Sequence, residues 1–422
     1  MTSSLHRLPR GFHWLIGAQF SSALADNALL IVTIALLQEQ GLPGWWAPLL
    51  KFGFTLSYVF LAPFVGPLAD AFAKARLMAW MNAVKAFGVL ALLAGVQPVL
   101  AFVVVGFGAA AYAPAKYGLI TELVPPERLV AANGWLEVSV VCAALLGTVL
   151  GGGLVSPWLL GSGWVQGASQ ALSDWPVVAD SALGVSLVTL LALYGLAGLF
   201  NLGVPDSGAR YPACRIHPGS LVRGFWRDHR TLWRDRDGGL SLAVTTVFWG
   251  LGATLQFAVL RWAADVLALP LSQAAYLQAA VAVGVVAGAA AAGRHVPLKR
   301  AKRMLPFGVL LGLMIPIVAN TGALPWAVVL LAVVGTVGGL LVVPLNALLQ
   351  HRGHQLLSAG RSIAVQGCSE NASVLAMLAG YAALVALDLP IITLMGFFGL
   401  AIAAAMLALI WRERARVRAN QA

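Results

Sequence analysis

The sequence predicts an all-α integral membrane protein, with twelve transmembrane helices arranged as two six-helix halves. Three observations predict this fold. The 422 residues are 60% hydrophobic and only 10% charged, with a mean hydropathy of +0.84, which is too apolar for a soluble globule. Apolar runs of membrane-spanning length recur along the whole chain, and one long polar insert divides them into two equal sets.

The thickness of the bilayer sets the length of each predicted helix, because about 20 apolar residues are needed to cross it. Breaks at charge clusters, Pro/Gly pairs and short polar stretches give twelve spans, at residues 14–37, 47–69, 77–95, 98–121, 133–155, 182–204, 240–268, 272–293, 304–320, 325–350, 361–387 and 390–411. We therefore expect an N-terminal half at residues 1–204, a cytoplasmic linker at 205–239 and a C-terminal half at 240–422.

The positive charge of the chain indicates its orientation. The net charge is +11, and nucleic acid is one partner class that such a balance suggests. However, all but four of the 27 Lys and Arg residues fall on one side of the membrane when both termini are placed in the cytoplasm. The positive-inside rule then predicts a multi-pass protein of the bacterial inner membrane, with both termini cytoplasmic. The basic loops should also meet anionic lipid headgroups.

Catalytic and metal-binding motifs are missing from the sequence. The three cysteines match no metal or redox spacing, and the chain contains no GxxxxGK[ST], HExxH or GxSxG string and no cluster of zinc ligands. We therefore expect no enzyme activity, no cofactor and no metal. An acyltransferase within the chain is also not expected, because the sequence ends soon after the last predicted span.

A short motif joins the second and third predicted spans. Residues 66–76 read GPLADAFAKAR. Gly66 permits close helix approach, while Asp70, Lys74 and Arg76 can form a cytoplasmic charge latch that breaks during alternating access. An ordinary turn with positive-inside charges is the alternative. String and position resemble the signature of the major facilitator superfamily, whose fold has the same two-half plan. The matching loop around Gly293 lacks an acidic residue, so a symmetric latch is not expected.

Ionisable residues inside predicted spans are the first candidates for a functional site, because hydrocarbon penalises them unless they face a cavity or a partner. Asp26 lies near the middle of the first span, roughly 18 Å along the helix from its cytoplasmic start. Lys85 and Lys116, in the third and fourth spans, can supply its countercharge. The alternative is a closed Asp–Lys pair that only fixes helix packing.

The remaining unusual residues within spans have simpler interpretations. Lys51 can extend its amine to the membrane surface. Arg261 can pair with Asp265, one turn later on the same helix face. Close helix contacts or bends are expected at Pro114, Pro344, Gly147, Gly151 and the glycines from 335 to 339.

Four longer strings resemble the bacterial lysophospholipid transporter family: residues 18–30 (AQFSSALADNALL), 111–118 (AYAPAKYG), 342–350 (VVPLNALLQ) and 363–371 (IAVQGCSEN). The resemblance runs from about residue 12 to 411. It implies a major facilitator fold that carries lysophospholipids to the cytoplasmic leaflet, where a separate acyltransferase/acyl carrier protein synthetase restores the missing acyl chain. It also implies a polar site formed by Asp26, Asn27, Lys116, Asn346, Glu370 and Asn371.

One position departs from the family pattern. In that family the seventh-span string Gly-Ala-Thr-Leu is followed by Arg, whereas this chain has Gln256 there. Arg261 lies five residues later, about 140° around an ideal helix, so it does not replace the missing cation on the same face. Gln256 stays a candidate substrate-binding residue, and the cation that the family pattern would supply for a phosphate is missing at this position.

The expected function is therefore a lysophospholipid flippase. Because each buried methylene contributes about 0.8 kcal/mol, the acyl tail should stay in lipid while a polar cavity shelters the headgroup. Asp26 would face an ethanolamine ammonium, and Lys116 or Lys85 would face the phosphate. The main alternative is a proton-coupled drug or small-solute antiporter, with Asp26 as the proton carrier. Two roles are expected for the basic loop from Arg210 to Arg236: to recruit a cytoplasmic enzyme, or only to enforce topology.

Overall fold

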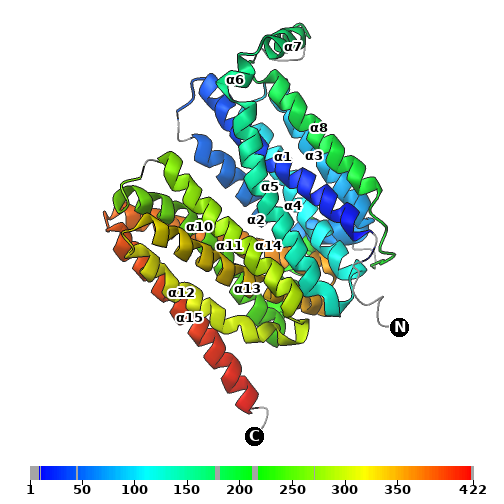
Figure 1. Ribbon diagram of the computed structural model, residues 1–422. Coiled ribbons are helices and arrows are strands. Elements are labelled where there is room, and N and C mark those ends of the chain that lie inside the picture. The colour runs from blue at the N-terminus through cyan, green and yellow to red at the C-terminus, as the bar shows by residue number, and fades with distance from the viewer. Residues whose placement is uncertain are drawn as a thin grey trace. The chain divides into compact units, whose positions relative to one another are not determined.

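The computed structural model describes residues 9, 11–43, 46–175, 181–211, 217–269 and 271–419. These residues form helices joined by short connections (Figure 1). Twelve of the helices are long and apolar enough to cross a membrane, as the sequence predicts. Residues 212–216 of the expected linker lie outside the described part of the chain.

The membrane-crossing helices follow the expected order. In the first half of the chain they are α1 (Phe12–Glu39), α2 (Trp46–Ala71), α3 (Lys74–Leu93), α4 (Pro98–Leu123), α5 (Leu129–Leu154) and α8 (Gly184–Leu202). In the second half they are α10 (Arg236–Asp265), α11 (Leu271–His295), α12 (Leu305–Ala319), α13 (Leu324–Leu356), α14 (Ala359–Ala386) and α15 (Ile391–Ala419). Helices α13 and α15 continue beyond the predicted span ends at residues 350 and 411, through polar sequence that need not lie in the bilayer.

Three further helices were not expected from apolar run length: α6 (Pro157–Leu160), α7 (Gly163–Ser173) and α9 (Pro218–Arg234). Two short 3₁₀ segments, Pro126–Arg128 and Leu298–Met304, lead into α5 and α12. The start of α6 has a cap of the expected chemistry, since the Ser156 side chain accepts a hydrogen bond from the Leu159 amide and Pro157 occupies the first turn. In Figure 1, α6 and α7 lie beyond the ends of α5 and α8.

The internal packing divides the chain into two compact units. Unit 1 comprises Met1–Leu123, Cys142–Asp228 and Leu357–Cys368. Unit 2 comprises Val124–Val141, His229–Leu356 and Ser369–Ala422. Helices α5 and α14 therefore contribute residues to both units, whereas the predicted halves, 1–204 and 240–422, follow the order of the spans along the chain.

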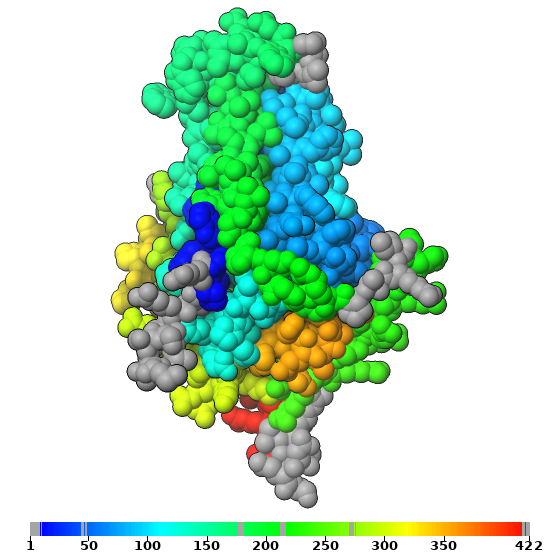
Figure 2. All heavy atoms as spheres, turned by 90° about the vertical axis from the view of Figure 1, so that its right-hand side faces the viewer, coloured from blue at the N-terminus to red at the C-terminus, as the bar shows by residue number. Residues whose placement is uncertain are grey.

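Unit 1 is organised around α1 and α4. Helix α3 packs against α4 and α8, and α8 in turn packs against α1. Figure 2 shows α8 (green) lying against α3 (blue) on one face of this unit. Small residues on α5 allow α1 to approach closely: a Cβ added at Gly147 would lie 2.6 Å from the Leu24 carbonyl oxygen, and one at Gly151 would lie 2.8 Å from that of Ala28. These glycines, expected to mark close contacts, hold the segment of α1 that carries Asp26.

Unit 2 has its own apolar core, formed mainly by α10, α12, α13 and α15. Helices α11 and α13 approach through glycines, since a Cβ at Gly335 would collide with the Val281 carbonyl oxygen. Trp262 is fully buried, and its indole N–H donates to the Ala319 carbonyl oxygen at 3.0 Å. The expectation of close packing at Gly335 is confirmed.

A buried pair of amides joins α5 to α13 within unit 2. The Asn133 amide nitrogen donates to Gln350 Oε1, and the Gln350 amide nitrogen donates back to Asn133 Oδ1, both at 2.8 Å. Replacing Gln350 leaves the buried Asn133 Oδ1 atom without its donor, while the Asn133 amide nitrogen keeps its hydrogen bond to the Leu129 carbonyl oxygen. We therefore expect Gln350→Leu to lower the stability by about 1–3 kcal/mol. The thermal unfolding midpoint in detergent should fall by several degrees. The double variant Asn133→Leu/Gln350→Leu should recover most of this loss, and a double variant less stable than the single one would contradict the expectation.

Candidate functional site

An ion pair at the centre of unit 1 forms the core of the candidate site. Asp26, on α1, has its Oδ2 atom 2.7 Å from Lys85 Nζ on α3. The Tyr194 hydroxyl on α8 donates to the other carboxylate oxygen, Oδ1, also at 2.7 Å. Three membrane-crossing helices therefore converge on one carboxylate, and the predicted intramembrane Asp–Lys pair is present.

Lys85 is held by a larger polar cluster. Its ammonium also donates to Ser22 Oγ at 3.0 Å, and the Ser22 hydroxyl donates to Asn82 Oδ1 at 2.7 Å. The ring of Tyr112 lies 5.0 Å from Lys85 Nζ, close enough for a cation–π contact. Only 2% of the Lys85 side chain is exposed, compared with 17% of the Asp26 side chain. The carboxylate is therefore the more accessible member of the pair.

The second predicted lysine has a different partner. Lys116, on α4, donates to Gln19 Oε1 at 3.0 Å and lies 4.5 Å from the centre of the Tyr117 ring. Asn27 donates from its side-chain amide to the Ala23 carbonyl oxygen one turn earlier. Lys85 is therefore a countercharge to Asp26, and Lys116 has a hydrogen bond to Gln19.

The other predicted binding residues belong to unit 2 and are described separately. Gln256 is exposed on α10, and its backbone carbonyl accepts a hydrogen bond from Gln278 at 2.8 Å. Asn346 is buried on α13, while Glu370 and Asn371 are half-buried on α14. Their part in substrate binding stays a prediction.

One simpler interpretation agrees with the structure. Arg261 Nε lies 3.3 Å from Asp265 Oδ2, so these two residues form the expected pair on α10. Lys51 is exposed on α2, but it lies close enough to Asp26 for the two charges to interact, so its outward extension stays a prediction.

The predicted latch residues surround the end of α2 within unit 1. Asp70 accepts hydrogen bonds from the Ser358 hydroxyl and from the Gly360 amide, the latter at 3.0 Å. Lys74 Nζ lies 3.5 Å from Asp70 and 2.6 Å from Glu122, on α4. The carboxylate of Asp70 thus satisfies amide and hydroxyl donors at the start of α14, where the helix dipole favours negative charge.

Gly66 has the close contact that its place in the motif predicts. A Cβ at this position would lie 2.9 Å from Arg361 Cα and 3.0 Å from Ala364 Cβ. Arg76 is exposed, and its charge contributes to lowering the pKa of Asp206, after the larger effect of the hydrogen bond from Arg210. Asp70 and Lys74 thus form one charge cluster with Glu122, a residue that the motif did not include. Its action as a latch stays a prediction.

Glu122 is a centre of hydrogen bonding that the sequence motif did not identify. The Ser207 hydroxyl donates to Oε2 at 2.5 Å, and the Tyr211 hydroxyl donates to Oε1 at 2.8 Å. Burial raises the pKa of Tyr211, and its hydrogen bond to Glu122 acts in the same direction. The chain that follows α8 is therefore tied to the end of α4.

In unit 2 the loop before α12 also has acidic partners, although its own sequence lacks them. Lys302 pairs with Asp237 on α10 and, at 3.0 Å, with Glu413 on α15. Arg236 reaches the same glutamate at 2.8 Å. The acidic member that the local sequence lacks thus comes from the two helices packed beside this loop.

The residues that sequence reasoning missed at the Asp26 cluster share one feature. Ser22, Asn82 and Tyr194 are polar side chains in the interior of otherwise apolar spans. Their polar groups face one another because hydrocarbon offers no other partner. The sequence prediction used only charged residues to find the site. A search for neutral polar residues at the same depth in the spans would have found the remaining members.

The comparisons with known proteins agree with this fold. A family model described as the Major Facilitator Superfamily matches residues 15–365. The chain belongs to the Major Facilitator Superfamily, a class of membrane transporters. The Lysophospholipid transporter LplT of Yersinia pestis (strain Pestoides F) is 42% identical over 386 residues, which are 91% of this chain and 89% of that relative. The resemblance found in the four sequence strings is thereby confirmed.

Solved structures support the fold alone, because their sequences are only distantly similar. A bacterial homologue of the iron transporter ferroportin, in an outward-facing state, has a TM-score of 0.70 at 15% identity, covering 96% of this chain and 100% of that one. The transporter FucP in its outward conformation has a TM-score of 0.70 at 16% identity, covering 95% and 98% of the two chains. The expected major facilitator fold is confirmed.

Proposed function

We propose that this protein is a flippase that moves lysophosphatidylethanolamine and related lysophospholipids from the outer to the inner leaflet of a bacterial inner membrane. The relative named as a lysophospholipid transporter supports the substrate class. The observation that carries the proposal is the ion pair between Asp26 and Lys85, which holds one negative and one positive group side by side inside unit 1. An ethanolamine phosphate headgroup carries the complementary two charges.

The chemistry of the site suggests an exchange of partners. When a zwitterionic headgroup enters, its ammonium can replace Lys85 at the Asp26 carboxylate, while Lys85 moves to the phosphate. One ion pair within the protein is then replaced by two between the protein and the headgroup, which limits the cost of breaking a pair inside the membrane. The acyl tail remains in lipid, because withdrawing a long tail into water costs on the order of 10 kcal/mol. Tyr194 keeps the carboxylate in place through its hydrogen bond.

The proposed orientation places the α2–α3 loop, the segment from 205 to 239 and both termini in the cytoplasm. The distribution of Lys and Arg along the sequence supports it. In this orientation the two sets of six spans, residues 1–204 and 240–422, correspond to the halves of the transporter. The released lysolipid would be reacylated by a cytoplasmic acyltransferase.

Transport in proteoliposomes tests the proposal. Labelled lysophosphatidylethanolamine is supplied in the outer leaflet, and its inward movement is followed with and without an imposed proton gradient. We expect protein-dependent movement without a gradient. An absence of movement in active, correctly oriented protein would contradict the proposal. Gradient-dependent export of a soluble substrate would instead support the antiporter alternative, in which Asp26 carries the proton.

A further inference from the structure

The linker helix α9 has two chemically different faces. Phe225 and Asp228 are buried against unit 1. The other side of the helix exposes Trp226, Arg223, Arg230 and Arg234, and Arg227 is also exposed but lines the pocket described below. A short helix with arginines and an exposed tryptophan on its outer side is typical of helices that lie at a membrane surface. The transport mechanism proposed above gives this face no role.

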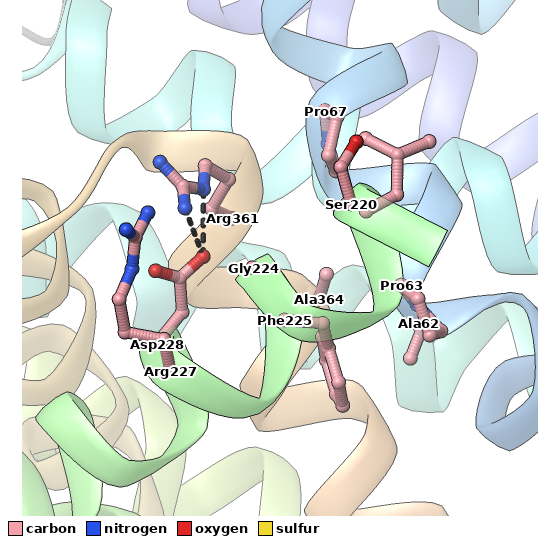
Figure 3. A pocket seen from close by; sticks show the side chains of 11 residues that line it. Ala62, Pro63, Pro67, Ser220, Gly224, Phe225, Arg227, Asp228, Arg361 and Ala364 are labelled. Atoms are coloured by element: carbon pink, nitrogen blue, oxygen red, sulfur yellow. Dashed lines mark hydrogen bonds and ion pairs between the residues drawn. The ribbon is translucent and has the colours of Figure 1, made fainter. Parts of the chain in front are cut away.

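A pocket lies beneath α9 within unit 1 (Figure 3). Its walls come from α2, α9 and the first turns of α14, and its volume is about 240 Å³. One water takes about 30 Å³ of the liquid, so this volume is that of several waters. It is enough for a phosphate group and part of the glycerol attached to it. Gly224 helps to keep it open, because a Cβ at this position would meet only the Arg361 guanidinium, at 4.0 Å.

The charged side chains around the pocket favour an anion. Arg361 pairs with Asp228, with Nε 2.7 Å and Nη2 2.5 Å from the same carboxylate oxygen, and Arg227 lies on the same wall. Two guanidinium groups and one carboxylate leave one net positive charge. Burial raises the pKa of Asp228, while the charges of Arg361 and Arg227 lower it. Because a guanidinium has five N–H donors, the pair with Asp228 leaves Arg361 able to bind a second acceptor.

An apolar surface on α2 leads along the membrane from this pocket. Pro63 and Pro67 line the pocket, and on the same helix Phe60 and Phe64 expose 69% and 37% of their surface. Residues spaced by three, four and seven share one side of a helix. Acyl chains can therefore follow α2 while the headgroup that they carry reaches the arginines.

We propose that the pocket under α9 binds the phosphate of an anionic diacyl phospholipid, of the phosphatidylglycerol class, from the cytoplasmic leaflet. The charge of the pocket selects the anionic headgroup, and the phenylalanines of α2 select a lipid over a free anion. The proposal rests on the orientation given above and not on the transported substrate. A failure of lysolipid transport would leave it standing, and a failure of lipid binding here would leave the transport proposal standing.

Fluorescence of Trp226 tests this proposal, because the residue lies on α9 between two pocket-lining positions, Phe225 and Arg227. The full chain is placed in phosphatidylcholine vesicles that contain increasing amounts of brominated phosphatidylglycerol. The Trp226 signal is the difference between the wild type and Trp226→Phe. We expect saturable quenching that brominated phosphatidylcholine does not reproduce. Millimolar inorganic phosphate should not compete.

Three variants assign the quenching to the pocket. Arg227→Gln should move the midpoint of the quenching curve to an about fivefold higher phosphatidylglycerol content, as expected for the loss of one cation near an anionic surface. Gly224→Leu, which fills the pocket without a backbone collision, should remove the saturable component. Arg223→Gln removes the same charge from α9 outside the pocket and should shift the midpoint less than twofold.

Other results would overturn the proposal. Equal quenching by the two brominated lipids would show that the pocket does not select phosphatidylglycerol. The arginines of α9 would then serve to bind a protein partner or only to set the membrane topology. Unchanged saturation in Gly224→Leu would place the lipid elsewhere. Full competition by inorganic phosphate would show that the pocket binds a free anion and not a lipid.

Discussion

Replacing Asp26 with asparagine should reduce lysophosphatidylethanolamine movement at least tenfold. Asparagine preserves the size of the side chain and its capacity to accept from Tyr194, but it removes the charge that pairs with Lys85. Breaking a buried pair by removing one partner costs on the order of 3–5 kcal/mol, because the remaining charge is uncompensated. Asp26→Asn should therefore also lower the thermal unfolding midpoint.

The double variant Asp26→Asn/Lys85→Gln separates function from packing. It removes both charges and keeps polar groups at both positions, so most of the lost stability should return. Lysolipid movement should nevertheless stay at the background rate, because neither charged group remains to bind the headgroup. Wild-type movement in the double variant would mean that the pair serves packing alone.

A matched control is available on α10. Arg261 and Asp265 form an exposed pair whose contribution to stability should be below about 1 kcal/mol. The variant Arg261→Gln/Asp265→Asn removes the same two charges from the protein, and it should retain both stability and lysolipid movement. A loss of movement in this control would show that the assay responds to charge in general and not to the Asp26 site.

The membrane-crossing helices could be predicted from the sequence, whereas the helices outside the membrane could not. Apolar run length predicted every membrane-crossing helix, because the bilayer thickness imposes a minimum length. It missed α7 and α9, which are too short or too polar to span and are recognisable only as amphipathic helices. In α9 the structure buries Phe225 and Asp228 and half-buries Leu221, but the arginines between them make the segment resemble a polar loop in the sequence.

The candidate site was predicted in part for a similar reason. Charge inside an apolar span identified Asp26 and Lys85, since such residues need a partner. Charge alone left both lysines as candidates for the countercharge. The choice of Lys85 over Lys116 depends on which helix faces are in contact, and the geometry of α1, α3 and α8 supplies that information.

Replacing Gly66 with leucine should separate α2 from the start of α14 and reduce lysolipid movement at least tenfold. A Cβ at Gly66 would lie within 2.9 Å of Arg361 Cα, and one at Gly360 would lie within 2.6 Å of the Gly66 carbonyl oxygen. Backbone atoms cannot yield by changing rotamer, so the first turn of α14 must move. The hydrogen bonds that Asp70 accepts from Ser358 and Gly360 would then lengthen.

Cysteine labelling measures that separation directly. Ala359 is fully buried, so a cysteine at this position, in a background without native cysteines, should react slowly with a water-soluble maleimide. Adding Gly66→Leu should increase the rate several-fold, because overpacking of this kind costs about 1–3 kcal/mol and is relieved when the helices part.

Gly198→Leu is the matched control for this experiment. Both substitutions introduce the same side chain into a membrane-crossing helix, but a Cβ at Gly198 meets no atom of the described structure within 4 Å. It should leave labelling and lysolipid movement unchanged. If Gly66→Leu behaved like this control, the contact of α2 with α14 would not limit transport. The hydrogen bonds of Asp70 would then stabilise a state that the protein can do without, so the charge motif would serve topology and not alternating access.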